Sequence, residues 1–142
     1  LVSHTRLLVS DETKATQAVL HHLREIERRG IHLRQGYRSL HEFTVTRLGY
    51  SDGAAARRIQ AMRLIRDLPE TETMLIEGTL TIETMSVLQR HFQTAKPKLE
   101  EKRKLVAQAQ SQSRREIERT LGRPETQAVY LKPETLKKLE AL

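Results

Sequence analysis

Apolar residues recur at helical spacing along almost the whole chain. The first such run comprises Ala15, Val19, Leu23 and Ile26. Intervals of four, four and three place these side chains on one face of an α-helix. Ser10 precedes the run as a candidate N-cap, and Gly30 follows it as a glycine stop. The pattern therefore predicts a first helix from about residue 11 to residue 29.

The same spacing, with start and stop signals, predicts further helices. Ser39 and Ser113 are each followed three positions later by a glutamate, which is the capping-box pattern. The expected helices cover residues 31–35, 39–48, 52–67, 69–77, 82–93, 98–110 and 113–121, and a last one opens at Pro133. Only residues 126–131 form a strand candidate. The predicted fold class is mainly α: a multi-helix domain with a helix-turn-helix core and at most one short strand near the C-terminus.

The predicted helix over residues 52–67 changes its apolar face midway. Its first stripe comprises Ala55, Ile59 and Met62, and its second comprises Ala61, Leu64, Ile65 and then Leu68. A helix with two apolar faces is expected to pack against two partners. This segment is therefore the candidate centre of the core.

Pro97 marks a break in the helical pattern. We expect residues 1–94 to form a helical DNA-binding domain and residues 95–142 a helical extension leading to a downstream region. The chain begins at Leu1 rather than Met, which points to a fragment of a longer protein. Dimerisation stays open at this point, since no heptad seam runs through enough turns to predict a coiled coil.

Residues 39–66 have the spacing of a helix-turn-helix motif, with Gly49 in the turn. On this hypothesis the second helix lies in the major groove of duplex DNA. The residues predicted to face base edges are Ser51, Ala54, Arg57 and Arg58, and those predicted to hold phosphates are Arg38, Arg47 and Arg63. From spacing alone, an αα-hairpin in a plain bundle is an equal alternative.

Charge favours a polyanionic partner. The 142 residues carry a formal net charge of +7, with 25 Lys and Arg against 18 Asp and Glu. In residues 1–69, eleven of the twelve basic residues are arginine, which suits bidentate contacts to phosphate and guanine. Aromatic residues make up only 4% of the chain, which argues against a single-strand binder that stacks bases.

Cysteine is absent, which excludes disulfides, thiolate metal sites and a cysteine nucleophile. No apolar run approaches the ~20 residues that cross a bilayer, and no signal-peptide pattern opens the chain. We therefore expect a cytoplasmic protein without a membrane partner.

Two resemblances rest on the central residues. Residues 48–90 contain a Gly-x-Ser turn, a long helix ending in Leu-Pro and a Glu-Gly-x-Leu-Thr step, and they resemble the DNA-binding region of ParB-type partition proteins. Residues 36–65 (GYRSLHEFTVTRLGYSDGAAARRIQAMRLI) and 113–121 (SRREIERTL) resemble the helical N-terminal regions of bacterial HNH endonuclease-like proteins. The second resemblance covers most of the chain. Both imply a bacterial protein that binds duplex DNA and associates with the nucleoid.

The HNH resemblance does not extend to catalysis. An HNH core needs metal-bound and general-base histidines with supporting Asn or Asp, and this chain contains no Asn. None of its six histidines has the HNH spacing. We therefore expect no enzymatic activity and no catalytic residue in this chain, which would be the targeting portion of a nuclease or a stand-alone DNA-binding regulator.

Other ligands find little support in the sequence. His21 and His22 are adjacent, so on a helix they point about 100° apart and do not converge on one ion. We expect no metal, no cofactor and no small-molecule substrate. The main alternative to DNA binding is a helical protein-interaction or oligomerisation domain whose arginines are surface charge, and RNA binding is a third, weaker hypothesis.

Overall fold

The computed structural model describes residues 1–110 and 112–122, and these residues form eight helices and no strand. This confirms the predicted mainly α, multi-helix class. The strand candidate at residues 126–131 and the helix expected from Pro133 lie outside the described residues.

The helices match most of the predicted segments. They are α1 (Val2–Arg29), α2 (Ile31–Arg34), α3 (Leu40–Thr46), α4 (Asp52–Asp67), α5 (Glu70–Glu77), α6 (Ile82–Ala95), α7 (Leu99–Ala109) and α8 (Arg114–Leu121). Gly30 and Gly78 end α1 and α5 with positive φ angles of 65° and 82°, a conformation that costs glycine little.

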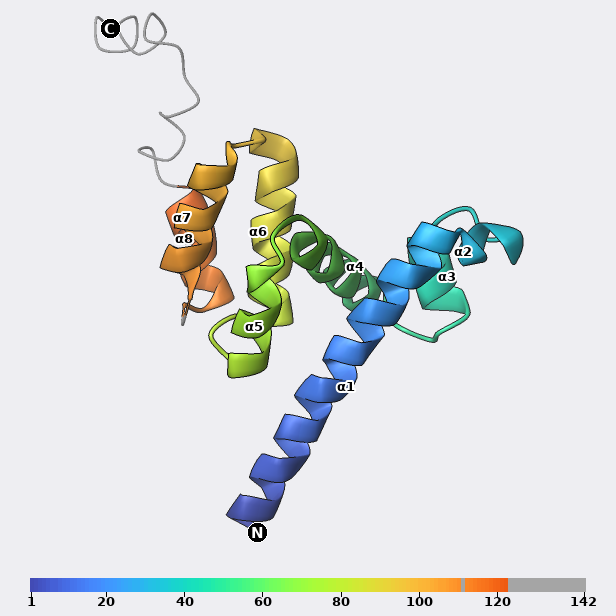
Figure 1. Ribbon diagram of the computed structural model, residues 1–142, viewed down its shortest axis with the longest axis horizontal. Helices are drawn as coiled ribbons and strands as arrows, with labels where there is room; N and C mark the ends of the chain where they lie inside the picture. The colour runs from blue at the N-terminus through green and yellow to red at the C-terminus, as the bar shows by residue number, and fades with distance from the viewer. Residues whose placement is uncertain (111, 123–142) are drawn as a thin grey trace, which may run out of the picture.

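The first helix is longer than predicted. It begins at Val2 rather than near residue 11, and Ser10 lies inside it instead of capping it. Helix propagation adds a backbone hydrogen bond for each residue ordered, so residues without a start signal can extend a helix nucleated beyond them. Residues 1–12 are almost entirely exposed, and this part of α1 projects away from the body of the molecule (Figure 1).

The predicted caps form, but only one side of each capping box is present. The Ser39 hydroxyl accepts from the Glu42 amide at 3.0 Å, and the Ser113 hydroxyl accepts from the Glu116 amide at 3.2 Å. The Glu42 carboxylate accepts instead from the backbone N–H of Arg38. A reciprocal capping box occurs where the sequence did not predict one, between Thr81 and Thr84 at the start of α6.

The helix α4 lies at the centre of the described fold. Its most extensive contacts are with α6, and it also contacts α1, α3 and α5 (Figure 1). Both predicted apolar stripes of α4 are buried. The expectation of more than one packing partner is therefore confirmed.

The core continues beyond the break predicted near residue 95. Helices α7 and α8 contact or adjoin α6, and their side chains Val106 and Ile117 belong to the same buried cluster as Leu64 and Leu88. The described helices thus share one core across Pro97. The longest of them, α1, could reach across a bilayer but is too polar to do so, and none of the others in the described part of the chain is both long and apolar enough.

Candidate nucleic-acid interface

The predicted helix-turn-helix unit is present as two contacting helices, α3 and α4. Gly49 in the turn has a φ of 83°, as the tight connection requires. The Ser51 hydroxyl accepts from the Ala54 amide at 3.2 Å and so caps α4. The carboxylate of Asp52, 3.1 Å from His41, also lies at this helix end. A phosphate approaching these amides would meet that negative charge.

The face of α4 predicted to read bases continues directly into the core. Residues seven positions apart lie on nearly the same side of a helix. Ala54, Arg57 and Arg58 are therefore followed along this side by Ala61, Leu64 and Ile65, which are 0, 0 and 7% exposed. The predicted reading face thus turns toward the interior as the helix proceeds.

Both arginines of that face are partly buried. The guanidinium of Arg58 lies 4.7 Å from the centre of the Tyr50 ring and donates to the Ala54 carbonyl at 3.1 Å. Arg58 also lines a crevice together with Thr16 of α1 and Leu80 of the α5–α6 turn. The Nε atom of Arg57 is buried without a hydrogen-bond partner. Neither side chain projects freely from the helix.

The solvent-facing side of α4 is a different one. The fully exposed residues of α4 are Asp52, Gly53, Ala56, Arg66 and Asp67. Two of these five are acids, and Arg66, the only basic residue among them, is paired with Glu27 and Asp67. This side therefore lacks the row of free donors that a helix in the major groove uses.

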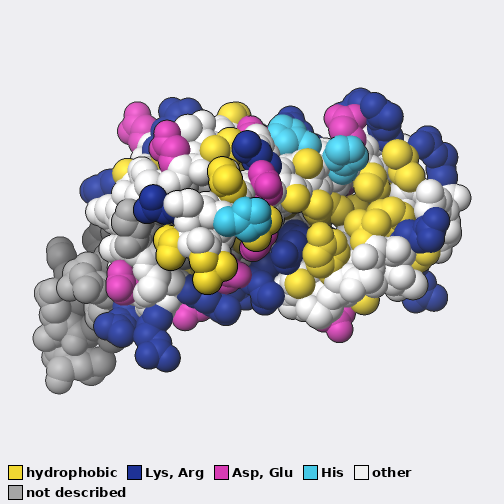
Figure 2. Space-filling view, turned by 90° about the horizontal axis from the view of Figure 1, so that it is seen from below, with side chains coloured by type: hydrophobic (Ala, Val, Ile, Leu, Met, Phe, Trp, Pro, Cys, Tyr) yellow, Lys and Arg dark blue, Asp and Glu magenta, His cyan; other side chains and the backbone are white. Residues whose placement is uncertain are grey.

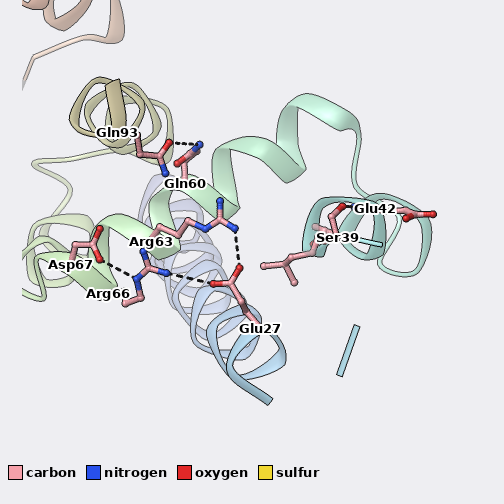
Figure 3. A network of polar contacts seen from close by, with 10 residues as sticks. Glu27, Ser39, Glu42, Gln60, Arg63, Arg66, Asp67 and Gln93 are labelled. Carbon is pink, nitrogen blue, oxygen red and sulfur yellow. Dashed lines mark hydrogen bonds and ion pairs between the residues drawn. The ribbon is translucent and has the colours of Figure 1, made fainter. Parts of the chain in front are cut away.

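Arg63, a predicted phosphate contact, is held by an acid of α1. Its guanidinium donates to Glu27 at 2.9 Å, and Arg66 lies 3.6 Å from the other oxygen of the same carboxylate (Figure 3). Arg66 also donates to Asp67, which accepts from Gln89 of α6. Burial raises the pKa of Asp67, but the hydrogen bonds from Arg66 and Gln89 outweigh it and leave that pKa below its ordinary value. The network fastens α4 to α1 and α6.

The other two predicted phosphate contacts are free. Arg38 and Arg47 are exposed at the two ends of α3, and Arg34 is exposed in α2. None of the three forms an ion pair with the described residues. We call Arg34, Arg38 and Arg47 the basic corner. The structure thus brings Arg38 and Arg47 to one end of the molecule and leaves Arg63 paired with Glu27.

An apolar surface that the sequence analysis missed lies along α1. Leu1, Leu8 and Leu48 are 103, 55 and 44% exposed, and Val2 and Val9 are 77 and 56% exposed.

A groove of ≈ 500 Å³ runs beside the second half of α1; it is lined chiefly by Ala18, Val19, His22, Ile26, Leu48 and Tyr50. We call this the α1 groove, and residues 1–11 the α1 arm. Figure 2 shows hydrophobic side chains gathered toward the α2–α3 end, with Lys and Arg at the rim. The missing signal was the start of α1, because Leu1 and Leu8 lie on the same side of α1 only if the residues between them are helical.

The α1 helix is fastened to the body on its other side. Gln17 donates to Glu72 of α5 at 2.8 Å, and His21 contacts the same carboxylate oxygen. The hydrogen bond from Gln17 is the main cause that keeps the pKa of Glu72 below its ordinary value. These contacts hold the α1 groove in place while the arm projects beyond them.

Within the described residues, no three His, Asp or Glu side chains come together as metal ligands. The chain matches no family model, and no curated protein or solved structure matches it significantly. The resemblances to ParB-type and HNH endonuclease-like proteins therefore remain hypotheses that rest on their motifs.

Proposed function

We propose that this chain is a helical protein-interaction domain, and that its contact surface is the α1 arm together with the α1 groove. One observation carries the proposal: an apolar stripe follows α1 from the exposed Leu1 and Leu8 to the partly buried Val19 and Ile26, which line the open groove. Isolated exposed leucines are ordinary, but exposed leucines that lead along one side of a helix into an apolar groove are typical of a binding surface.

The size of the surface fits a weak, reversible contact. Full burial of a leucine or valine removes roughly 100 Å² of apolar surface from water. At their exposed fractions, Leu1, Leu8 and Leu48 together offer roughly 200 Å², before the groove residues are added. A stable complex buries ~800 Å² on each partner, a little over half of it apolar, and smaller interfaces are typical of transient complexes.

Cysteine labelling in the cells that produce the protein tests this function without knowledge of the partner. The chain has no cysteine, so a single introduced thiol is an unambiguous reporter. Leu7 and Leu8 are adjacent leucines that are both exposed, but only Leu8 lies on the stripe. We expect Leu8→Cys to be protected from a maleimide reagent and Leu7→Cys to be labelled. Equal labelling of both variants would reject the proposal.

Duplex DNA binding is a second candidate, and the basic corner favours it. Arg34, Arg38 and Arg47 are exposed without ion pairs to described residues, and the chain as a whole carries +7. Together these three arginines offer a positively charged surface for phosphates. On this proposal the arginines of α4 stabilise the fold and do not contact bases. The chain would be a DNA-targeting module that binds through the basic corner.

Salt dependence of duplex binding tests the second candidate. Duplex binding is measured by fluorescence anisotropy at several salt concentrations. In the triple variant Arg34→Ala, Arg38→Ala and Arg47→Ala, the plot of log affinity against log salt should become less steep by about 3. The matched variant Arg57→Ala with Arg58→Ala should leave that slope unchanged. Loss of binding only in the second variant would restore α4 as the recognition helix, and no binding by the parent chain would reject DNA binding.

A further inference from the structure

We propose that the partner of the α1 surface is a second copy of this chain, whose α1 packs antiparallel against the first. This inference rests on the proposed interaction function and adds the identity and register of the occupant. It follows from the two halves of the α1 surface, which are complementary to each other. One half is the projecting arm, which exposes Leu1 and Leu8 on this side, and the other is an apolar groove that can receive them.

The spacing of the apolar residues sets the register. Positions that alternate by three and four residues share one side of α1 and form a seam of Leu1, Thr5, Leu8, Glu12, Ala15, Val19, His22 and Ile26. An antiparallel partner places Leu8 against Val19 of the second copy and Leu1 against its Ile26. Both contacts are repeated by the two-fold symmetry, as an isologous interface requires. The start of α1 at Val2, rather than near residue 11, lengthens this seam to almost four heptads.

Occupancy of the groove also explains why the arm projects. Residues 1–11 have almost no contact with their own body and are exposed, yet they are helical. A short isolated helical end is marginal in water. In the antiparallel pair each arm lies in the α1 groove of the other copy, beside Leu48 and Tyr50. The two-fold symmetric dimer thus buries both arms.

One residue of the seam opposes the association. Glu12 is the only acidic residue on it and faces Ala15 of the second copy, close to the two-fold axis. The two Glu12 carboxylates therefore approach each other. A charged side chain at a seam position lowers stability while it sets register. The dimer should accordingly be reversible, and Glu12→Leu should tighten it by about tenfold or more.

Sedimentation equilibrium of the full chain over a range of concentrations measures the association. We expect a monomer–dimer equilibrium that Leu8→Glu weakens by at least about tenfold. The neighbouring leucine supplies the matched control, since Leu7 lies off the seam and Leu7→Glu should leave the equilibrium unchanged. Equal effects of the two substitutions, or no tightening by Glu12→Leu, would contradict the seam.

Disulfide formation between introduced cysteines tests the direction. A disulfide needs Cα atoms closer than ~7 Å, and in the proposed register the two Leu8 positions are about 16 Å apart along the helix axis. Leu8→Cys alone and Val19→Cys alone should therefore not cross-link, while an equimolar mixture should give one heterodimer band. Cross-linking within either single variant would indicate parallel helices and overturn the proposal.

Labelling in cells and the association of the purified chain together distinguish this inference from the function on which it rests. If the purified chain stays monomeric while Leu8→Cys is protected in cells, the occupant is another protein and the second copy is rejected. If the thiol is labelled in cells and the purified chain is monomeric, both proposals fail. A dimer with the expected cross-link supports both.

Discussion

The guanidinium of Arg58 lies over the ring of Tyr50, 4.7 Å from its centre. The two residues stand on opposite sides of Ser51, the N-cap of α4. Their contact folds the end of the α3–α4 turn back onto the helix that follows. It also directs Arg58 toward α1 and the α5–α6 turn, where Thr16 and Leu80 line the same crevice. The sequence pattern predicted that Arg58 faces solvent, but in the structure its side chain packs between α4 and its neighbours.

We predict that Tyr50→Ala destabilises the protein and Tyr50→Phe does not. A cation–π contact at a partly exposed site contributes about 0.5–2 kcal/mol, and phenylalanine retains the ring face. The free energy of unfolding, measured by urea titration at low protein concentration, should fall by about 1–2 kcal/mol in the alanine variant. Equal losses in the two variants would show that the Tyr50 hydroxyl, rather than the ring beneath Arg58, is what matters.

The ion pair between Arg63 and Glu27 makes a second prediction. It joins α4 to α1 at 2.9 Å, with side chains that are 31 and 27% exposed. A partly buried pair of this kind is expected to contribute about 1 kcal/mol of coupling. A double-mutant cycle with Arg63→Ala and Glu27→Ala, followed by urea unfolding, measures that coupling. A coupling indistinguishable from zero would mean that the pair does not fasten the two helices.

Acid should loosen the attachment of α1 to α5. The hydrogen bond from Gln17 lowers the pKa of Glu72, and the contact with His21 adds to it. A carboxyl whose pKa is lower in the folded state stabilises the fold above its unfolded pKa, and this contribution is lost as pH falls through the folded pKa. The free energy of unfolding should therefore fall from pH 7 to pH 3. In Glu72→Gln this fall should be smaller by about 0.5 kcal/mol.

Glu77→Gln is the matched control for this pH effect, because Glu77 is exposed at the end of the same helix and forms no ion pair with the described residues. It removes the same charge without touching α1. Urea unfolding at both pH values gives the comparison. If the two variants change the pH dependence equally, the effect belongs to the overall charge of α5 and not to Gln17 and His21.

Two glycines near the start of α4 should respond oppositely to alanine. Gly49 has a φ of 83°, which strains any L side chain even though space is free around it. We expect Gly49→Ala to cost about 1–2 kcal/mol of stability. Gly53 lies inside α4, where a Cβ meets only the flexible end of Arg57 at 3.0 Å. Gly53→Ala should be neutral or stabilise by up to about 1 kcal/mol. Thermal unfolding monitored by circular dichroism distinguishes the two; a stabilising Gly49→Ala would contradict the turn geometry.

The sequence by itself determined the helices and their inward faces. Periodic apolar residues, serine caps and glycine stops are local signals, and they predicted α2 to α8 to within a few residues and the two buried stripes of α4. The start of α1 escaped because a helix can extend over residues that carry no start signal, so the arm and its apolar stripe were not foreseen.

Only the tertiary structure decided which exposed positions remain free. The side chains of Arg57, Arg58 and Arg63 could point to solvent on an isolated helix, and the sequence contains nothing that excludes it. Packing of α1 on α4 placed Glu27 beside Arg63, and the path of the α3–α4 turn placed Tyr50 beneath Arg58. Arg38 and Arg47 stayed free because no described element covers the ends of α3. The availability of a charge is set by neighbours distant in sequence, and the same long-range packing leaves one side of α1 uncovered.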